Sequence, residues 1–214
     1  MSDFRQEFLR FALNEQVLAF GEFQTKAGRL SPYFFNAGLF NHGSALWQLA
    51  RFYAQAIISS KVEFDMLFGP AYKGIVLAAV TAAALSEQGK DVSFAYNRKE
   101  AKDHGEGGVI VGAKLSGRIL IIDDVISAGT SVRESVTLIK NANATVAGVA
   151  IALDRMEKGV GELSAVEEVK QQFNVPVVSI ASLNDLLLML SYDNNSELAK
   201  FLPKVKEYRQ KYGV

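Results

Sequence analysis

The sequence predicts an α/β fold in which a central, mainly parallel sheet is flanked by helices, with a small hood formed mainly by the N-terminal segment. Two observations indicate this class. Short β-rich runs alternate with helical stretches along the middle of the chain, and several of these runs lack polar alternation. A strand that is apolar on both faces is typical of a parallel sheet covered by helices on both sides.

The two ends of the chain are predicted to pack together as the hood over this sheet. One face of the first helix is apolar and carries Phe4, Phe8, Phe11 and Ala12. A hairpin is expected over 20–36. At the other end, a helical stretch over 196–212 is expected to be interrupted by Pro203, because proline lacks a backbone N–H.

Between the ends, five strands are predicted to alternate with five helices. The strands are 66–68, 92–96, 119–122, 146–153 and 177–180. The helices are 44–60, 73–88, 130–141, 164–173 and 182–190. Ser164 and Glu167 have the spacing of a capping box, which marks the start of the fourth of these helices.

The chain is predicted to be a single domain, 1–214, since it shows no internal repeat, low-complexity tract or linker. The hood takes residues 1–40 plus the C-terminal helix, and the core takes residues 44–190.

Composition narrows the classes of function. The 214 residues include 23 Lys+Arg and 23 Asp+Glu, so the formal net charge is zero, and 49% are hydrophobic, which excludes a disordered chain. A neutral protein has no global field to gather nucleic acid or anionic lipid, so an anion must be bound by a local cluster. The absence of cysteine excludes thiolate nucleophiles and sulfur-ligated metals, and two histidines argue against a zinc site.

The sequence also predicts a soluble, cytoplasmic protein with no membrane or nucleic-acid partner. The N-terminal segment has no unbroken apolar core, so it is neither a secretory signal nor a transit peptide. The longest weakly polar run, 75–85, is far shorter than the ~20 residues of a membrane-spanning helix.

The segment 119–131 is the most informative in the chain. An apolar strand is followed by Asp123 and Asp124, then by a turn of small residues, then by a helix. A parallel strand delivers the two acids to its carboxyl edge, where ligands bind in open α/β sheets. The small residues let backbone N–H groups surround an anion at the start of the next helix. Because ionised Asp accepts hydrogen bonds from hydroxyls, a sugar phosphate satisfies both halves of this motif.

Other interpretations of this segment are weaker. A lone Asp-Asp pair is most often a helix cap, but the strand before it and the small-residue turn after it argue against that here. No G-x-x-x-x-G-K-[ST] motif occurs, and Ile110 stands where a dinucleotide fingerprint over 105–110 would need its third glycine.

The segment resembles the signature by which phosphoribosyltransferases bind 5-phosphoribosyl 1-pyrophosphate (PRPP): apolar strand, Asp-Asp, two apolar residues, then Ser/Thr-Ala-Gly-Thr. Ser127 stands where threonine is common, and its hydroxyl can still bond to phosphate. The resemblance implies that Asp123 and Asp124 hold the ribose hydroxyls. It also implies that the 5′-phosphate is held by Ser127, Ala128, Gly129, Thr130 and Ser131.

A second turn, 69–74, follows another apolar strand and opens another helix. Lys73 lies at a helix start, where a cation is disfavoured by roughly 0.3–1 kcal/mol unless an anion is bound. A solvated lysine is the alternative. The resemblance implies that this turn, with Tyr72 and Lys73, meets the pyrophosphate.

The polar segment 97–108 is expected to be a mobile loop, and a solvated hairpin tip is the alternative. Its residues 98–105 resemble the catalytic loop of the orotate phosphoribosyltransferases, a group of the type I family. The resemblance implies that this loop closes over the pyrophosphate and is donated across a homodimer interface. The residues concerned are Arg98, Lys99, Lys102 and His104.

A third cluster, 25–36, has the pattern Lys-x-Gly-x-x-Ser-Pro-x-Phe-x-Asn, which resembles the hood of the same group. The resemblance implies that Lys26 reaches the pyrophosphate and orotate, that Phe34 and Phe35 border the pyrimidine, and that Arg155 meets the orotate carboxylate. Aromatic pairs are otherwise usually core. The chemistry agrees with the resemblance, because a guanidinium fork suits a planar carboxylate.

Taken together, the resemblance implies transfer of the phosphoribosyl group of PRPP to N1 of orotate, giving orotidine 5′-monophosphate and pyrophosphate in pyrimidine biosynthesis. The expected cofactor is Mg²⁺, held mainly by substrate and water. The expected catalytic residues are Lys26, Lys73, Lys102, His104 and Asp124. A phosphoribosyltransferase for another base and a non-catalytic PRPP-sensing regulator are the alternatives. Arg155 argues against the first, and the lack of a helix-turn-helix or basic patch argues against the second.

Overall fold

The alternation of side chains along the central strands explains why helices cover both faces of the sheet. In β6 (Arg118–Ile122), Ile119 and Ile121 belong to one buried apolar cluster, whereas Leu120 and Ile122 belong to another. Successive residues of a strand point to opposite faces, so both faces must be covered. The computed structural model describes residues 3–25, 28–102, 108–159, 161–192 and 197–214, and only the backbone of 101–102.

Within these ranges the central sheet has the strand order β5-β4-β3-β6-β7-β8. Five of its strands are parallel: β3 (Met66–Gly69), β4 (Ser93–Lys102), β6, β7 (Thr145–Asp154) and β8 (Val177–Ser182). The sixth, β5 (Gly108–Gly112), runs antiparallel to β4 at the edge. The predicted class, a mainly parallel sheet flanked by helices, is confirmed.

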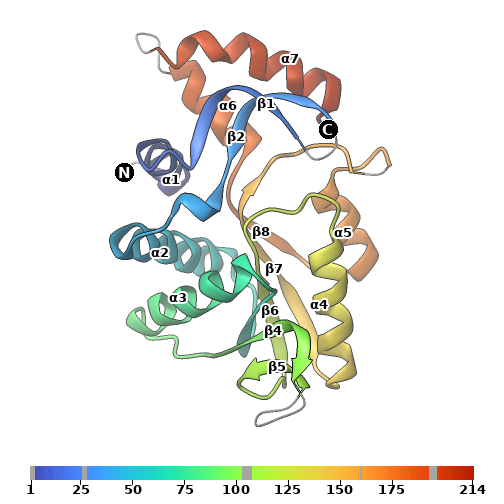
Figure 1. Ribbon diagram of the computed structural model, residues 1–214. Helices are drawn as coiled ribbons and strands as arrows, with labels where there is room; N and C mark the ends of the chain where they lie inside the picture. Colours follow the sequence, from blue (N-terminus) through green and yellow to red (C-terminus); the bar gives the residue numbers. More distant parts are fainter. Residues whose placement is uncertain (1–2, 26–27, 103–107, 160, 193–196) are drawn as a thin grey trace.

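Two pairs of helices sandwich the sheet (Figure 1). One face carries α2 (Gly43–Ser60) and α3 (Lys73–Glu87). The other face carries α4 (Thr130–Asn141) and α5 (Ala165–Phe173). As predicted, Ser164 caps α5: its hydroxyl accepts a hydrogen bond from the backbone N–H of Glu167 at 3.0 Å.

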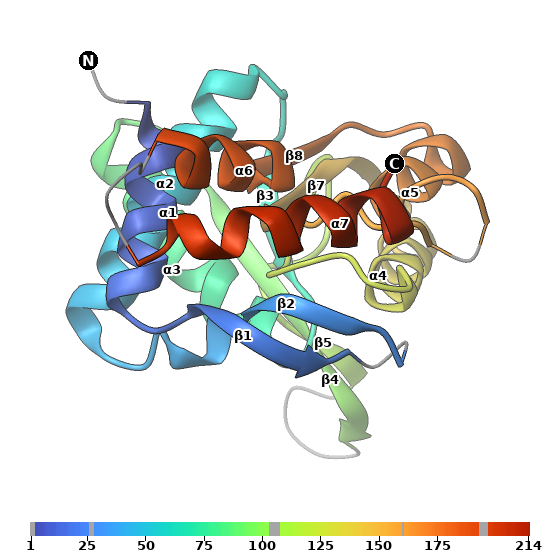
Figure 2. The ribbon, with the colours of Figure 1, turned by 90° about the horizontal axis from the view of Figure 1, so that it is seen from above.

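The hood is built from both ends of the chain. It contains α1 (Phe4–Asn14), the antiparallel strands β1 (Leu18–Gln24) and β2 (Leu30–Phe35), and the short η1 (Ala37–Leu39). It is completed by η2 (Ala199–Phe201), α7 (Leu202–Tyr212) and α6 (Leu183–Tyr192), and the last of these was predicted as part of the core but packs against α1 and α7 as well as β8. Figure 2 shows α7 alongside the hairpin, and the rings of Tyr33 and Tyr208 meet edge to face with centroids 6.2 Å apart.

The predicted boundaries are wrong at two places. The strand predicted over 92–96 continues to Lys102, and β5 was not expected, so 97–102 is strand rather than loop. The last residue of β3, Gly69, pairs with Tyr96, and beyond that point β4 pairs with β5. An edge pair of this kind tolerates charged residues, which explains why the polar sequence did not indicate a strand.

The second difference concerns Pro203, which lies in the first turn of α7 instead of interrupting a helix. In that turn the missing N–H has no intrahelical partner to lose. The remaining predicted strands and helices of the core begin and end within two residues of those observed. The single-domain division stays a prediction. Over the part of the chain described here, no helix is both long and apolar enough to cross a bilayer.

The turn between β3 and α3 packs directly on the end of β6. A Cβ atom added at Gly74 would lie 2.6 Å from Cδ of Pro70 and 2.8 Å from the carbonyl oxygen of Ile122. A Cβ atom at Gly69 would lie 2.1 Å from the carbonyl oxygen of Gly74. Both positions therefore need glycine, and the close approach brings the two turns singled out from the sequence side by side.

We expect Gly74→Ala to lower the free energy of unfolding by about 1–3 kcal/mol, because backbone atoms must move to admit the methyl group. Gly43→Ala is the matched control, since no atom lies within 4 Å of its added Cβ and the residue opens α2. That control should be neutral or more stable by up to ~1 kcal/mol. Urea unfolding measures both variants, and equal midpoints would contradict the close approach.

Candidate active site

The backbone of the acid pair is fixed at the carboxyl end of β6. The N–H of Asp123 donates to the carbonyl of Ala150 at 3.0 Å, and the N–H of Ala152 donates to the carbonyl of Asp124 at 2.9 Å. The hydroxyl of Tyr53, from α2, donates to the carbonyl of Asp123 at 2.8 Å and is fully buried. These bonds hold Asp123 and Asp124 between β7 and α2.

The two carboxylates have different partners. One oxygen of Asp123 accepts from the hydroxyl of Ser131 at 2.9 Å, and the other accepts from the N–H of Asp124 at 3.0 Å. One oxygen of Asp124 accepts from the N–H of Val125 at 2.9 Å, and the other pairs with the ammonium of Lys73 at 2.6 Å. Gly129 is the N-cap of α4, so the alternative that the acids are helix caps is wrong.

Asp123 and Asp124 are only 8% and 7% exposed. Burial, and then repulsion from the Asp124 carboxylate, raises the pKa of Asp123 to about 6. The hydrogen bond from Ser131 acts in the opposite direction but does not cancel the shift. Two acids held this close favour a ligand that donates hydrogen bonds or carries positive charge.

Lys73 is the first residue of α3, and Tyr72 before it makes no side-chain cap. The carboxylate of Asp124 supplies a negative charge beside this ammonium, and the contact of Lys73 with a pyrophosphate stays a prediction. Lys73 is half-exposed, so the ion pair opens to solvent on one side.

The turn before Lys73 is tied to β4. The N–H of Ala71 donates to the side-chain oxygen of Asn97 at 2.9 Å, and the Ala71–Tyr72 peptide bond is cis. Tyr72 is exposed, with the ammonium of Lys99 5.3 Å from its ring centroid. The sequence analysis did not single out Asn97. As the first polar residue after an apolar strand that adjoins β3, it could have been recognised.

The small-residue turn leads into α4 with its residues largely open to solvent. Gly129 has a φ of 69°, in the left-handed region that glycine adopts without strain. Ser127, Ala128 and Thr130 are exposed. Arg133 spans the turn, with its guanidinium donating to the carbonyl of Ala128 and to the hydroxyl of Thr130. The turn therefore combines a helix N-terminus, exposed hydroxyls and a guanidinium.

The cationic residues predicted over 25–36 and 97–108 are only partly covered by the described residues. Arg98 and Lys99 are on β4, half-buried and exposed respectively. Lys26 and His104 lie outside the described residues, as does the side chain of Lys102.

Phe34 and Phe35 lie on opposite faces of the hairpin. Phe34 is 41% exposed and stacks on Phe23 with ring centroids 5.4 Å apart. Phe35 is 7% exposed, and its ring lies 6.2 Å from that of Phe8 in the core. Neighbouring residues of a strand point to opposite faces, so the two rings cannot both border one ligand. The predicted place of Phe35 beside a pyrimidine therefore does not fit the arrangement, whereas Phe34 is available for it.

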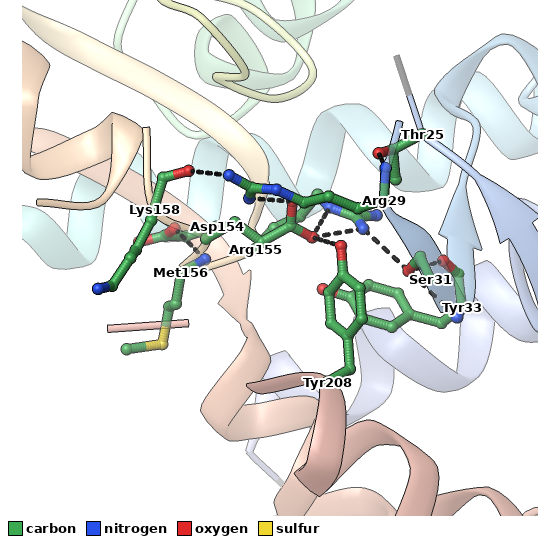
Figure 3. Close-up of polar contacts among 10 residues, drawn as sticks. Thr25, Arg29, Ser31, Tyr33, Asp154, Arg155, Met156, Lys158 and Tyr208 are labelled. Carbon is green, nitrogen blue, oxygen red and sulfur yellow. Dashed lines mark hydrogen bonds and ion pairs between the residues drawn. The ribbon is translucent and has the colours of Figure 1, made fainter. Parts of the chain in front are cut away.

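Arg155 lies just past the end of β7 and points into the hood (Figure 3). Its Nε donates to Glu157 at 2.8 Å, and its Nη2 donates to the hydroxyl of Ser31 at 3.2 Å. Its guanidinium carbon lies 4.4 Å from the ring centroid of Tyr33. The acid beside it is thus Glu157, whereas the carboxylate of the neighbouring Asp154 accepts from the backbone N–H of Met156.

The segment after Arg155 is paired with the last residues of the chain. The N–H of Lys158 donates to the carbonyl of Tyr212 at 2.8 Å, and the N–H of Val214 donates to the carbonyl of Met156 at 3.1 Å. The guanidinium of Arg29 donates to the carbonyl of Lys158 at 3.0 Å. This segment is therefore held from both sides by the hood.

The topology brings the predicted clusters to one edge of the sheet. β3, β6 and β7 are adjacent and parallel, and their ends carry Lys73, the acid pair and Arg155. Arg155 follows closely on Ala152, which bonds to Asp124. The described residues contain no group of three or more His, Cys, Asp or Glu side chains placed to hold a metal ion.

Comparison with known proteins agrees with this geometry. Residues 39–180 match the family model described as the phosphoribosyl transferase domain. An orotate phosphoribosyltransferase of Neisseria meningitidis serogroup C is 69% identical over the whole of both chains. One of Chromobacterium violaceum is 69% identical over 100% of this chain and 99% of its own.

A solved structure shares the fold as well as the sequence. The crystal structure of an orotate phosphoribosyltransferase of Francisella tularensis superposes with a TM-score of 0.87 at 45% identity, covering 97% of this chain and 100% of its own. The chain therefore belongs to the phosphoribosyltransferase family and, within it, to the orotate phosphoribosyltransferases.

Proposed function

We propose that this chain transfers the 5-phosphoribosyl group from PRPP to N1 of orotate, giving orotidine 5′-monophosphate and pyrophosphate in pyrimidine biosynthesis. One observation carries the assignment of the site: Lys73 and the acid pair meet beside the exposed small-residue turn of 127–131. In this arrangement Lys73 suits the pyrophosphate of PRPP, the acid pair suits its ribose hydroxyls, and the turn suits its 5′-phosphate. The full-length identity to orotate phosphoribosyltransferases supports the choice of base.

Binding of PRPP exchanges the partners of Lys73 and Asp124. In the structure the two side chains neutralise each other at 2.6 Å. The ammonium pairs with the pyrophosphate, and the freed carboxylate of Asp124 accepts from a ribose hydroxyl, as Asp123 does beside it. The 5′-phosphate accepts hydrogen bonds from the hydroxyls and backbone N–H groups of 127–131 at the start of α4.

The transfer proceeds through an oxocarbenium-like transition state, in which C1′ becomes positive while pyrophosphate leaves. Protein catalysis is positioning and charge stabilisation. Asp124 lies on the side of the ribose, where a carboxylate favours positive charge. Lys73 and Lys99, with Lys26, Lys102 and His104 of the segments outside this description, stabilise charge on the leaving group. His104 and Asp124 stay the two candidates for removing the proton of orotate.

The proposed cofactor is Mg²⁺, which would be held mainly by substrate and water. The donor set fits, because Asp123 and Asp124 would offer the hard oxygen atoms that this ion prefers beside a bound sugar phosphate. When bound, the ion withdraws negative charge from the pyrophosphate oxygens. The cytoplasmic location expected from the sequence stays a prediction.

We expect the purified protein to consume orotate only when both PRPP and Mg²⁺ are present. Loss of the ultraviolet absorbance of orotate measures this directly. Turnover of adenine, guanine or hypoxanthine without turnover of orotate would reject the base while keeping the family. PRPP binding without turnover of any base would favour the PRPP-sensing alternative.

We expect the affinity for PRPP to fall as the pH falls through about 6, because a protonated Asp123 carboxyl is a weaker acceptor for the ribose hydroxyl than the carboxylate is. In Asp123→Asn this pH dependence should be lost, and PRPP should bind roughly 10- to 150-fold more weakly at pH 8. Calorimetry with PRPP measures the affinity of both proteins at each pH. The ratio of the two affinities removes the effect of protonating PRPP itself, because that effect is common to both proteins.

The raised pKa of Asp123 also affects stability, and here the pH trend is opposite to that of PRPP affinity. The folded state favours protonated Asp123, so this contribution is present below the ordinary pKa of Asp and is lost as the pH rises through about 6. Asp123→Asn should therefore gain stability relative to the parent protein between pH 4 and pH 8. A constant difference in Tm across that interval would contradict the shift.

We expect Arg155→Lys to raise the KM for orotate and Arg155→Ala to raise it further, with PRPP affinity largely retained. Lysine keeps the charge but not the planar guanidinium that Glu157 and Ser31 hold in place, and an unpaired carboxylate in a partly desolvated site costs roughly 2–5 kcal/mol. Uracil, which lacks the carboxylate, should be a poor substrate of the parent protein, and its kcat/KM should fall less than that of orotate in the two variants. Equal losses of kcat/KM for orotate and uracil would assign Arg155 a structural role instead.

The proposed enzyme is a homodimer in which each catalytic loop acts in the partner's site. A Lys102→Ala chain mixed with an Asp124→Asn chain should then form heterodimers with one intact site. Activity should exceed that of either homodimer. Absence of recovery despite confirmed subunit exchange would place the loop over its own site, and a monomer in solution would exclude the arrangement.

A further inference from the structure

The carboxylate of Glu157 joins three elements that are distant in the sequence. Its Oε1 accepts from Nε of Arg155 at 2.8 Å and from the hydroxyl of Tyr208 at 3.1 Å. Its Oε2 lies 3.6 Å from Nη1 of Arg29. In Figure 3 the side chains of Arg29, Arg155 and Tyr208 converge from the hairpin, the end of β7 and α7.

The guanidinium of Arg155 is fixed by two hydrogen-bonding partners and one aromatic ring. Glu157 binds its Nε and Nη2, Ser31 accepts from Nη2, and the ring of Tyr33 lies against the guanidinium. Ser31 in turn donates to the carbonyl of Tyr33 at 2.7 Å, so its hydroxyl is itself oriented. The side chains of Arg155 and Glu157 are only 15% and 17% exposed. A long, flexible side chain is thereby fixed before any ligand arrives.

The position of Glu157 decides where a second carboxylate can bind. A guanidinium presents its donors along two forked edges. Glu157 takes the edge formed by Nε and Nη2. An incoming carboxylate must therefore approach at the Nη1 end, in the plane that Glu157 and Ser31 have set.

Glu157 also has an opposing effect, because its negative charge repels an incoming carboxylate. The repulsion acts across the guanidinium, in a cluster where Arg29 supplies a second positive charge. The aligning contacts are direct hydrogen bonds between charged groups, which are the stronger kind. Alignment should therefore outweigh repulsion.

We propose that Glu157 is a positioning residue that aims Arg155 at the carboxylate of the base, and that it thereby sets the preference for orotate over uracil. This inference rests on the proposed function, specifically on Arg155 as the residue that meets the orotate carboxylate. The contacts of Glu157 themselves are independent of that function.

The test compares Glu157→Gln and Glu157→Ala with the parent protein in steady-state assays. Glutamine keeps the size and one acceptor oxygen but loses the charge, so the orotate KM should rise roughly tenfold. Alanine should raise it further. The kcat at saturation and the KM for PRPP should stay within twofold, and the ratio of kcat/KM for orotate over uracil should fall by the same factor as the orotate KM rises.

Glu162→Gln is the matched control. Glu162 lies on the same connection and pairs with Lys158, but its side chain is 91% exposed, and this variant should match the parent protein. If Glu157→Ala fails to fold, Glu157→Gln carries the test. A double-mutant cycle adds the decisive readout: in an Arg155→Ala background, Glu157→Gln should leave the orotate KM unchanged.

Three results would overturn the inference alone: an unchanged or lowered orotate KM in Glu157→Gln, equal losses for orotate and uracil, or additive effects in the cycle. A fall in the KM would mean that repulsion dominates. A parent protein that does not consume orotate, or an Arg155→Ala variant with an unchanged orotate KM, would instead reject the proposed function on which the inference rests.

Discussion

Lys73 and Asp124 come from the ends of two neighbouring strands, and their ion pair joins the two turns on which the site is built. The pair is possible because Gly69 and Gly74 let the β3–α3 turn lie against the end of β6. It is half-open to solvent, and each group is one that a pyrophosphorylated sugar can take as its partner. The free protein thus keeps these two charges compensated while leaving their partners exchangeable.

A second polar cluster, around Glu157, joins the hood to the end of β7, as the Lys73–Asp124 pair joins the two turns at the sheet edge. Residues 29, 155 and 208 are separated by most of the chain, yet their side chains meet on one carboxylate. The hood therefore does more than cover the sheet. It supplies the contacts of Ser31 and Tyr33 with Arg155, so the position of that guanidinium depends on how the hood packs against the core.

The sequence predicted the sheet well because its strands are apolar on both faces and its helices have clear limits. It predicted the edge pair of β4 and β5 poorly, since charged residues on an edge strand look like a loop. At the site, the sequence was enough to predict that the acid pair and Lys73 lie at the same edge of the sheet, because parallel strands bring their carboxyl ends together. The partners of Arg155 could not be predicted. Ser31 and Tyr33 reach it only through tertiary packing, and Tyr208 meets it only through Glu157. Strand alternation separates Phe34 from Phe35 in a way that a motif does not reveal.

The pairing of residues 156–158 with 212–214 has a consequence for how the protein is made. A growing chain leaves the ribosome N-terminus first, so the strands and helices of the core are available before α7 exists. Contacts between distant parts of a chain form late because a long loop must close first. The edge that holds Asp123 and Asp124 can thus be assembled on the nascent chain. The contacts around Glu157 have to wait for α7, so a chain that stops before α7 would keep the paired turns around Asp123 and Asp124 but lack the Tyr208 contact to Glu157.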